Sequence, residues 1–179
     1  RIAFFQNRPL PIVTFALWSI NRAERAGHYF AAARNYSGLG WVFGLAGAPK
    51  VADAYFVRAK EAGARAGDHG GLVFALTSEA VYRIGLGEWP QVEALLTACE
   101  APCAATRDPQ GWELMTTLRG HPAYLKGDLE LALDLHRAVL RSARSRGNRQ
   151  HTAWSHYCVG RAELARGQVE PARVALEAA

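Results

Sequence analysis

Two cysteines of the chain, Cys99 and Cys103, are spaced in a way that could hold a metal ion. They lie four residues apart, which would place both on one face of a helix, and His136 or His156 could supply further ligands. A structural zinc site is usually built from two close pairs of ligands, and a second such pair is missing. With Cys158 the cysteines number three, and their spacing gives no disulfide framework, which favours a reducing compartment. We therefore interpret the cysteines as small buried residues and predict no metal ligand.

Histidines, serines and carboxylates also lack the spacings that catalysis requires. His151 and His156 are five residues apart, so they do not share a helix face as an i, i+4 metal pair would, and no HExxH motif accompanies them. Serines such as Ser37 and Ser155 lie in no nucleophile-elbow pattern. The carboxylates are scattered at positions that helix capping and solvation explain. The sequence therefore predicts a protein that is not an enzyme and that holds no cofactor.

The glycine-rich segment SGLGWVFGLAG, residues 37–47, could form a phosphate-binding loop through Gly38, Gly40 and Gly44. Such a loop needs a strand before it and a helix after it, so that the helix N-terminus meets the phosphate. The residues before Gly38 have a helical pattern instead, and Gly40 and Gly47 recur along the chain at a fixed interval. We therefore expect a helix here and not a nucleotide loop.

The composition is typical of a soluble globular protein with a moderate positive charge. The chain has 179 residues, half of them hydrophobic, and a formal net charge of +5 from 21 basic and 16 acidic residues. The one dense basic stretch, residues 141–149, is better explained by interaction with a helix dipole than by phosphate binding. The apolar run at residues 10–20 is too short to span a bilayer, and no cleavage site follows it. We expect a cytoplasmic protein with no membrane segment.

Glycine recurs along the chain with a period of 40 residues. The recurring residues are Gly47, Gly87, Gly127 and Gly167. Three further sets of small or capping residues keep the same period: Gly40, Ala80, Gly120 and Gly160; Ala52, Val92, Ala132 and Ala172; and Asp68, Asp108 and Asn148. Four sets in one register indicate a true internal repeat.

Each set has a physical role in a unit of two helices. The first glycine set can adopt the left-handed conformation that ends a helix, so each member marks a turn. The Asp and Asn side chains can cap the first turn of the following helix, and Pro109 directly after Asp108 fits a first helical position. The other small residues allow the two helices of a hairpin to approach closely, because a large side chain there would overpack the contact.

The sequence thus predicts nine helices joined by tight turns, with no strand. Pro122 should kink its helix or end it early, because a proline inside a helix loses a hydrogen bond. The expected helices span residues 10–26, 29–46, 49–66, 70–86, 89–101, 109–126, 129–146, 149–166 and 169–179.

The C-terminal third carries a recognisable pattern, namely Gly127, Asp128, Ala132, Gly160, Gly167 and Ala172. In these residues the chain resembles the tetratricopeptide-repeat family, in its longer variant of about forty residues per unit. The resemblance implies an all-α fold, a right-handed α-solenoid of stacked antiparallel helix hairpins with about four and a half repeats. The second unit departs from the family pattern at Arg83 and Val92, so its local packing is expected to differ.

We expect a single helical-repeat domain over the whole chain. Its parts are a half repeat at 1–28, repeats at 29–68, 69–108 and 109–148, and an incomplete repeat at 149–179. The segments RSRGNRQHTAW and GRAELARGQ also resemble the helical arrays that follow the ATPase module in large bacterial signalling proteins, including class III adenylate cyclases and STAND-type regulators. This second resemblance, together with a chain that begins at Arg1 and stops on LEAA, implies a fragment of a larger modular protein.

Stacked helix pairs form an open array with a long concave surface that suits binding. The resemblance implies that the first helix of each pair lines this groove, and Trp, Tyr and Arg usually dominate interface energies. We therefore predict a non-catalytic scaffold that binds a protein, a peptide or other domains of its own chain, although the same aromatics could instead fill space between repeats. The predicted partner-binding residues are Trp41, Phe74, His121, Tyr124, Trp154, Tyr157 and Arg161; Ser37, Thr77 and Thr117 are expected on or near the same surface.

Two other functions stay open at this point. One is a small-molecule sensor, which would need a closed apolar pocket in the groove. The other is a nucleic-acid-binding array, which would bind in a salt-sensitive manner through a basic stretch. That stretch comprises Arg137, Arg141, Arg144, Arg146 and Arg149.

Overall fold

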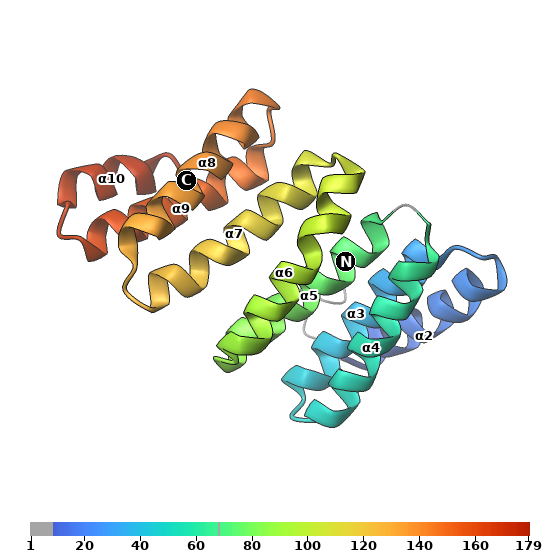
Figure 1. The fold of residues 1–179 in the computed structure, drawn as a ribbon. Coiled ribbons are helices and arrows are strands. Elements are labelled where there is room, and N and C mark those ends of the chain that lie inside the picture. Colours follow the sequence, from blue (N-terminus) through green and yellow to red (C-terminus); the bar gives the residue numbers. More distant parts are fainter. Residues whose placement is uncertain (1–8, 68) are drawn as a thin grey trace. The chain divides into compact units, whose positions relative to one another are not determined.

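The computed structural model describes residues 9–67 and 69–179, and all regular structure within them is helical, as predicted (Figure 1). No helix in these ranges is both long enough and apolar enough to cross a membrane. The contacts between residues divide the chain into two compact units, 1–108 and 109–179, and this boundary coincides with the predicted start of a repeat. The helices are α2 (Pro9–Arg25), α3 (Tyr29–Leu45), α4 (Pro49–Arg65), α5 (Gly70–Leu86), α6 (Trp89–Thr106), α7 (Pro109–Leu125), α8 (Leu129–Ser145), α9 (Arg149–Ala165) and α10 (Val169–Glu177).

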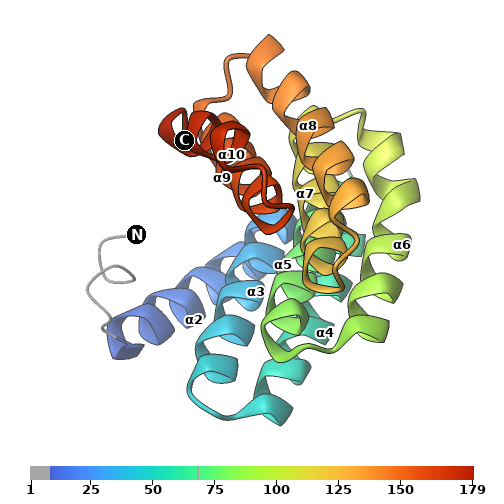
Figure 2. The same cartoon turned by 90° about the vertical axis from the view of Figure 1, so that its left-hand side faces the viewer.

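Within each unit the helices pack in sequence as antiparallel hairpins. In the first unit α2 packs on α3, α3 on α4, α4 on α5 and α5 on α6, and α3 also contacts α5. In the second unit α7 packs on α8, α8 on α9 and α9 on α10, and α7 also contacts α9. The two views agree on this neighbouring order of α7, α8 and α9 (Figures 1 and 2). The contacts between successive first helices are those expected of stacked helical repeats.

The turns recur every 20 residues, which is half the period read from the sequence. All four glycines of the predicted turn set have positive φ, between 72° and 84°. Gly27, Gly67 and Gly147 also have positive φ, and each lies 20 residues before one of the predicted turns. At Gly127, for example, the backbone N–H of Asp128 donates to the carbonyl of Ala123, which closes the helix end in a Schellman-type turn.

The turn at residue 107 interrupts this series, because it lacks glycine. Arg107 occupies the position and has a φ of 49°, which a residue with a Cβ adopts at a cost. Its helix, α6, runs to Thr106 and contains Pro102, so the predicted end at residue 101 was wrong by five residues. Pro122 likewise does not end α7 early, since that helix continues to Leu125. The neighbours Cys103 and Ala123 are buried, and this packing holds the last turn of each helix despite the lost hydrogen bond.

The predicted capping residues are accounted for in part. The Asn148 side chain accepts a hydrogen bond from the backbone N–H of His151, at 3.2 Å, and so caps α9 as predicted. Asp128 caps α8 in the same way through Leu131. Asp68 lies outside the described residues. The hydrogen bonds of Asn148 and Asp128 each satisfy one of the free N–H groups of a first helical turn.

The small residues of the first helices lie against large side chains of the second helices. A Cβ added at Gly40 would come within 2.8 Å of the Phe56 ring, and one at Gly160 within 2.6 Å of Leu176. A Cβ at Gly120 would overlap the ring of His136. Members of the other small set, at positions 52, 92, 132 and 172, are all buried. The predicted role of both sets in close helix packing is therefore confirmed. The segment that contains Gly38 and Gly40 is part of α3, as expected, and forms no loop.

Replacing Arg107 by Gly should stabilise the first unit by about 1 kcal/mol, because the left-handed conformation costs an L-residue roughly that amount and glycine nothing. Chemical denaturation followed by circular dichroism measures this change. Gly87→Arg, the reverse substitution at an equivalent turn, serves as the control and should destabilise by a similar amount. If Arg107→Gly were no more stable than the natural chain, the left-handed conformation of Arg107 would be contradicted.

Gly63→Ala should destabilise the protein by roughly 1–3 kcal/mol, which is the usual cost of overpacking. The new Cβ would lie 2.6 Å from the backbone carbonyl carbon of Gly71, and a backbone cannot swing aside as a side chain can. Gly38→Ala is the matched control, because Gly38 is exposed on α3 with nothing within 4 Å of its Cβ position. That variant should gain up to about 1 kcal/mol from helix propensity. A stable Gly63→Ala protein would refute the close α4 and α5 contact.

Candidate functional site

Three of the predicted binding residues come together on α7 and α9 of the second unit. The Arg161 guanidinium carbon lies 4.5 Å from the ring centre of Tyr124 and 5.4 Å from that of Tyr157. Cation–π contacts of this length hold the arginine against both rings. Burial disfavours the charge of Arg161, but its hydrogen bond with Tyr124 and the electrostatic effects of Tyr124, Tyr157 and Cys158 together outweigh this effect, and the pKa of Arg161 is raised. The guanidinium is therefore charged and fixed in place between two aromatic rings.

Trp154 extends this surface along α9. Its side chain is 47% exposed, close to the 49% of Tyr157, so both rings are accessible to a partner. The Trp154 ring stacks on His151, with ring centres 5.4 Å apart and planes inclined by 27°. We call Tyr124, Trp154, Tyr157 and Arg161 the aromatic face of the second unit.

A buried carboxylate, Glu113 of α7, lies next to His151. Glu113 is fully buried, and its oxygens accept hydrogen bonds from Ser142 at 2.7 Å and from Arg146 at 2.6 Å. The Nδ1 atom of His151 lies 3.0 Å from the carboxylate, which is ion-pair distance, although the angle does not form a hydrogen bond. Asn148, the cap of α9, donates to the same carboxylate at 3.3 Å.

The electrostatic environment keeps Glu113 ionised. Burial alone would raise the pKa of this carboxyl, but the hydrogen bonds from Arg146 and Ser142 and the positive charge of Arg146 lower it below its ordinary value of 4.5. The carboxylate therefore links the end of α8 to the start of α9, beneath the aromatic face.

The two predicted binding residues of the first unit have other surroundings. Trp41 of α3 packs edge-on against Tyr82, with ring centres 6.4 Å apart, beside the buried cluster of Ala52, Phe56 and Tyr82. Phe74 of α5 lies under the guanidinium of Arg34, 5.1 Å from its ring centre. Both rings are half-buried and make intramolecular contacts, which is the space-filling alternative that the sequence left open.

Three hydroxyl residues expected near the groove are buried instead. Ser37, Thr77 and Thr117 are each less than 8% exposed. Each hydroxyl donates to the carbonyl four residues earlier in its own helix, at 2.7–2.9 Å. They therefore do not line a surface, because a hydroxyl satisfied by its own backbone packs as a small core residue.

His121, which was predicted as a groove residue, belongs to a second cluster. Its ring centre lies 5.7 Å from that of His136, and His121, His136 and Cys158 have potential ligand atoms within 4.8 Å of one another. They come from α7, α8 and α9 respectively. From the sequence, His136 was considered as a metal ligand together with Cys99 and Cys103, but those two cysteines are buried in α6 of the first unit. A signal was nonetheless present, because His136 occupies the repeat position that holds Phe56, Leu96 and Leu176 elsewhere.

Most of the predicted basic stretch is engaged in contacts within the second unit. Arg137 pairs with the buried Glu163, and Arg146 pairs with Glu113. Arg144 lies 2.7 Å from the Nε2 atom of His156, within hydrogen-bonding distance. Arginines held by carboxylates on their own chain offer less charge to a phosphate backbone.

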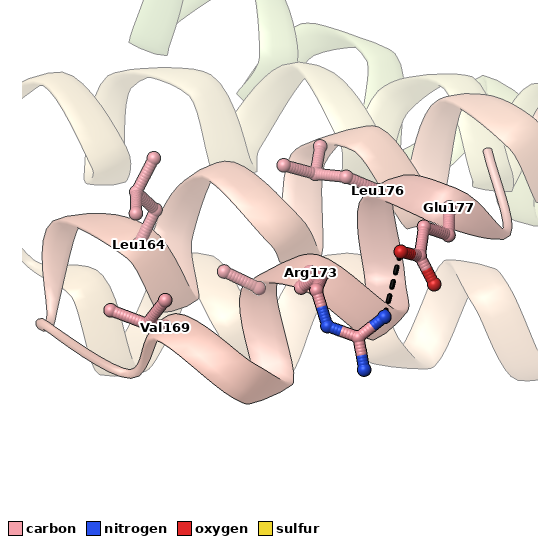
Figure 3. Close-up of a pocket in the computed structure, with 6 residues that line it drawn as sticks. Leu164, Val169, Arg173, Leu176 and Glu177 are labelled. Atoms are coloured by element: carbon pink, nitrogen blue, oxygen red, sulfur yellow. Dashed lines mark hydrogen bonds and ion pairs between the residues drawn. The ribbon is translucent and has the colours of Figure 1, made fainter.

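A shallow apolar pocket of about 410 Å³ lies between the end of α9 and α10 (Figure 3). Its rim is open to solvent, since Leu164 and Val169 are more than half exposed, and Arg173 at its edge bonds to Glu177 at 2.7 Å. The small-molecule alternative required a closed pocket within the groove, and this hollow is open.

Glu113→Gln should destabilise the second unit by about 2–4 kcal/mol, because it leaves the hydrogen bonds of Arg146 without a carboxylate.

The lowered pKa of Glu113 also determines how the stability of the second unit changes with pH. An unfolded chain binds the proton first as pH falls, so this stabilisation is complete above pH 4.5 and is lost as pH falls further through the folded pKa. Thermal unfolding between pH 7 and pH 2 should show a smaller acid destabilisation in Glu113→Gln. Glu130→Gln, which removes an exposed carboxylate, is the control and should change stability by less than about 1 kcal/mol.

Comparison with known protein families and curated proteins identified no relative of this chain. No protein-family model matches the chain, and no curated protein is significantly similar to it.

Proposed function

We propose that the chain is a non-catalytic, tetratricopeptide-like scaffold that binds a protein or peptide segment through the aromatic face of its second unit. The observation that carries this proposal is the arrangement of Arg161 between Tyr124 and Tyr157, with Trp154 exposed on the same helix. These are the residue types that most often dominate binding energies, and here they are accessible. A regulatory role inside a larger cytoplasmic signalling protein is part of the same proposal.

The rigidity of the aromatic face supports binding. Arg161 contacts two rings, and Trp154 stacks on His151, whose backbone N–H donates to the Asn148 side chain. Side chains that are already ordered lose little conformational entropy when a partner arrives.

The charge of Arg161 suggests the chemistry of the partner. In the described part of the chain no carboxylate pairs with Arg161, and the polar side chains that interact with it are Tyr124, Tyr157, Cys158, His121 and His136. Arginines in planar contacts favour bidentate pairing with a carboxylate. The best-fitting partner is therefore an acidic segment that also carries an apolar or aromatic side chain for Trp154.

Replacing Trp154 and Tyr157 by Ala should reduce the retention of specific partners at least tenfold, because each loss of a buried aromatic contact usually costs more than about 1 kcal/mol. The measurement is quantitative pull-down from lysate of the source cells with the natural and variant chains. The matched control is Leu131→Ala/Val174→Ala, which removes two exposed apolar side chains from the second helices α8 and α10. Unchanged retention of every partner by the Trp154 and Tyr157 variant would refute this surface as the binding site.

A further inference from the structure

The cluster of His121, His136 and Cys158 is not explained by packing alone. His136 is only 2% exposed, and its Nδ1 atom is buried without a hydrogen-bond partner. The ring lies over Gly120, where the absence of a Cβ makes room for it. At the equivalent positions of the neighbouring repeats a leucine or phenylalanine fills this space at no such cost.

All three side chains can supply electron pairs to a metal ion. Burial, with the charges of His121 and Arg161, lowers the pKa of His136 to about 4, and burial also lowers the pKa of His121. Both imidazoles are therefore neutral at pH 7, which is the form that binds metals. Burial raises the pKa of the Cys158 thiol to about 11, so a metal ion would displace its proton on binding.

The geometry requires only a small adjustment to close around an ion. The potential ligand atoms lie within 4.8 Å of one another. Three ligands around one ion, with metal bonds of about 2.0–2.3 Å, lie about 3.5–4 Å apart. The half-buried His121 side chain on α7 would have to move toward His136 and Cys158 to reach this distance, while His136 stays on Gly120.

We propose that His121, His136 and Cys158 form a binding site for a thiophilic transition-metal ion, and that Cu⁺ fits it best. Two imidazoles and a thiolate are ligands that both Cu⁺ and Zn²⁺ accept. With one thiolate, Cu⁺ gives a neutral complex, whereas Zn²⁺ keeps a positive charge close to the Arg161 guanidinium. Cu⁺ also accepts three ligands, whereas Zn²⁺ usually requires a fourth. The site does not depend on the peptide binding proposed above, although His121 borders the aromatic face.

The test is an anaerobic titration of the purified chain, free of any affinity tag, with Cu⁺ buffered by a chromophoric chelator. The natural chain should bind one Cu⁺, and His136→Leu should weaken this binding at least 100-fold. This variant restores the residue found at positions 96 and 176, so its melting temperature should equal or exceed that of the natural chain. Cys158→Ser should lose Cu⁺ to the same degree and should also lose the sulfur-to-metal charge-transfer band of a Co²⁺-loaded sample.

Cys103→Ala and His156→Gln are matched controls, since each removes a buried thiol or imidazole outside the cluster. Both should bind Cu⁺ as the natural chain does. Parallel titration with Zn²⁺ identifies the ion, because Zn²⁺ binding with the same dependence on His136 and Cys158 would support the site and assign it to zinc. Failure of the natural chain to bind either ion, or undiminished binding by His136→Leu, would overturn the proposal.

Discussion

The close contact between a small residue on the first helix of a hairpin and a bulky residue 16 positions later on the second sets the geometry of the repeat. It joins Gly40 to Phe56 and Gly160 to Leu176, and Gly120 to His136. Because a Cβ at any of these glycines would overlap its partner, the spacing of the two helices depends on its absence. The remaining hairpin has Ala80 and Leu96 at the corresponding positions, so a small residue, either glycine or alanine, recurs at this contact with the period of the structure.

The helix boundaries could be predicted because their determinants are local. A turn with positive φ favours glycine strongly enough to place one at almost every helix end, and the 40-residue period could therefore be read without any knowledge of contacts. The 20-residue half period was less visible, since Arg107 interrupts it. The predicted end of α6 was also wrong: residue 107 is not a glycine, so no glycine marked the turn, and the helix continues through Pro102 to Thr106.

For the candidate site, the sequence could predict which residues share a helix face but not how deeply each side chain is buried. Residues Tyr124, Tyr157 and Arg161 meet because they lie on first helices that contact each other, and the repeat alone implies that contact. The repeat does not specify whether each of these side chains is exposed or buried. Ser37, Thr77 and Thr117 share the polar character of groove residues, yet their hydroxyls bond to their own helices and the residues become part of the core.

Two buried polar residues of the second unit, Glu113 and His136, both stand at repeat positions that hold apolar residues elsewhere, and the comparison between them is informative. The carboxylate of Glu113 has its hydrogen bonds satisfied by groups that arrive 29–35 residues later in the chain, which no local pattern announces. Its burial is thereby compensated, and its structural role is complete. His136 has no such compensation at Nδ1, and a leucine would fill the same space without leaving a polar atom unpaired. A repeat that accommodates leucine at this position in two other hairpins has no packing need for histidine, and the proposed metal binding together with His121 and Cys158 accounts for the imidazole.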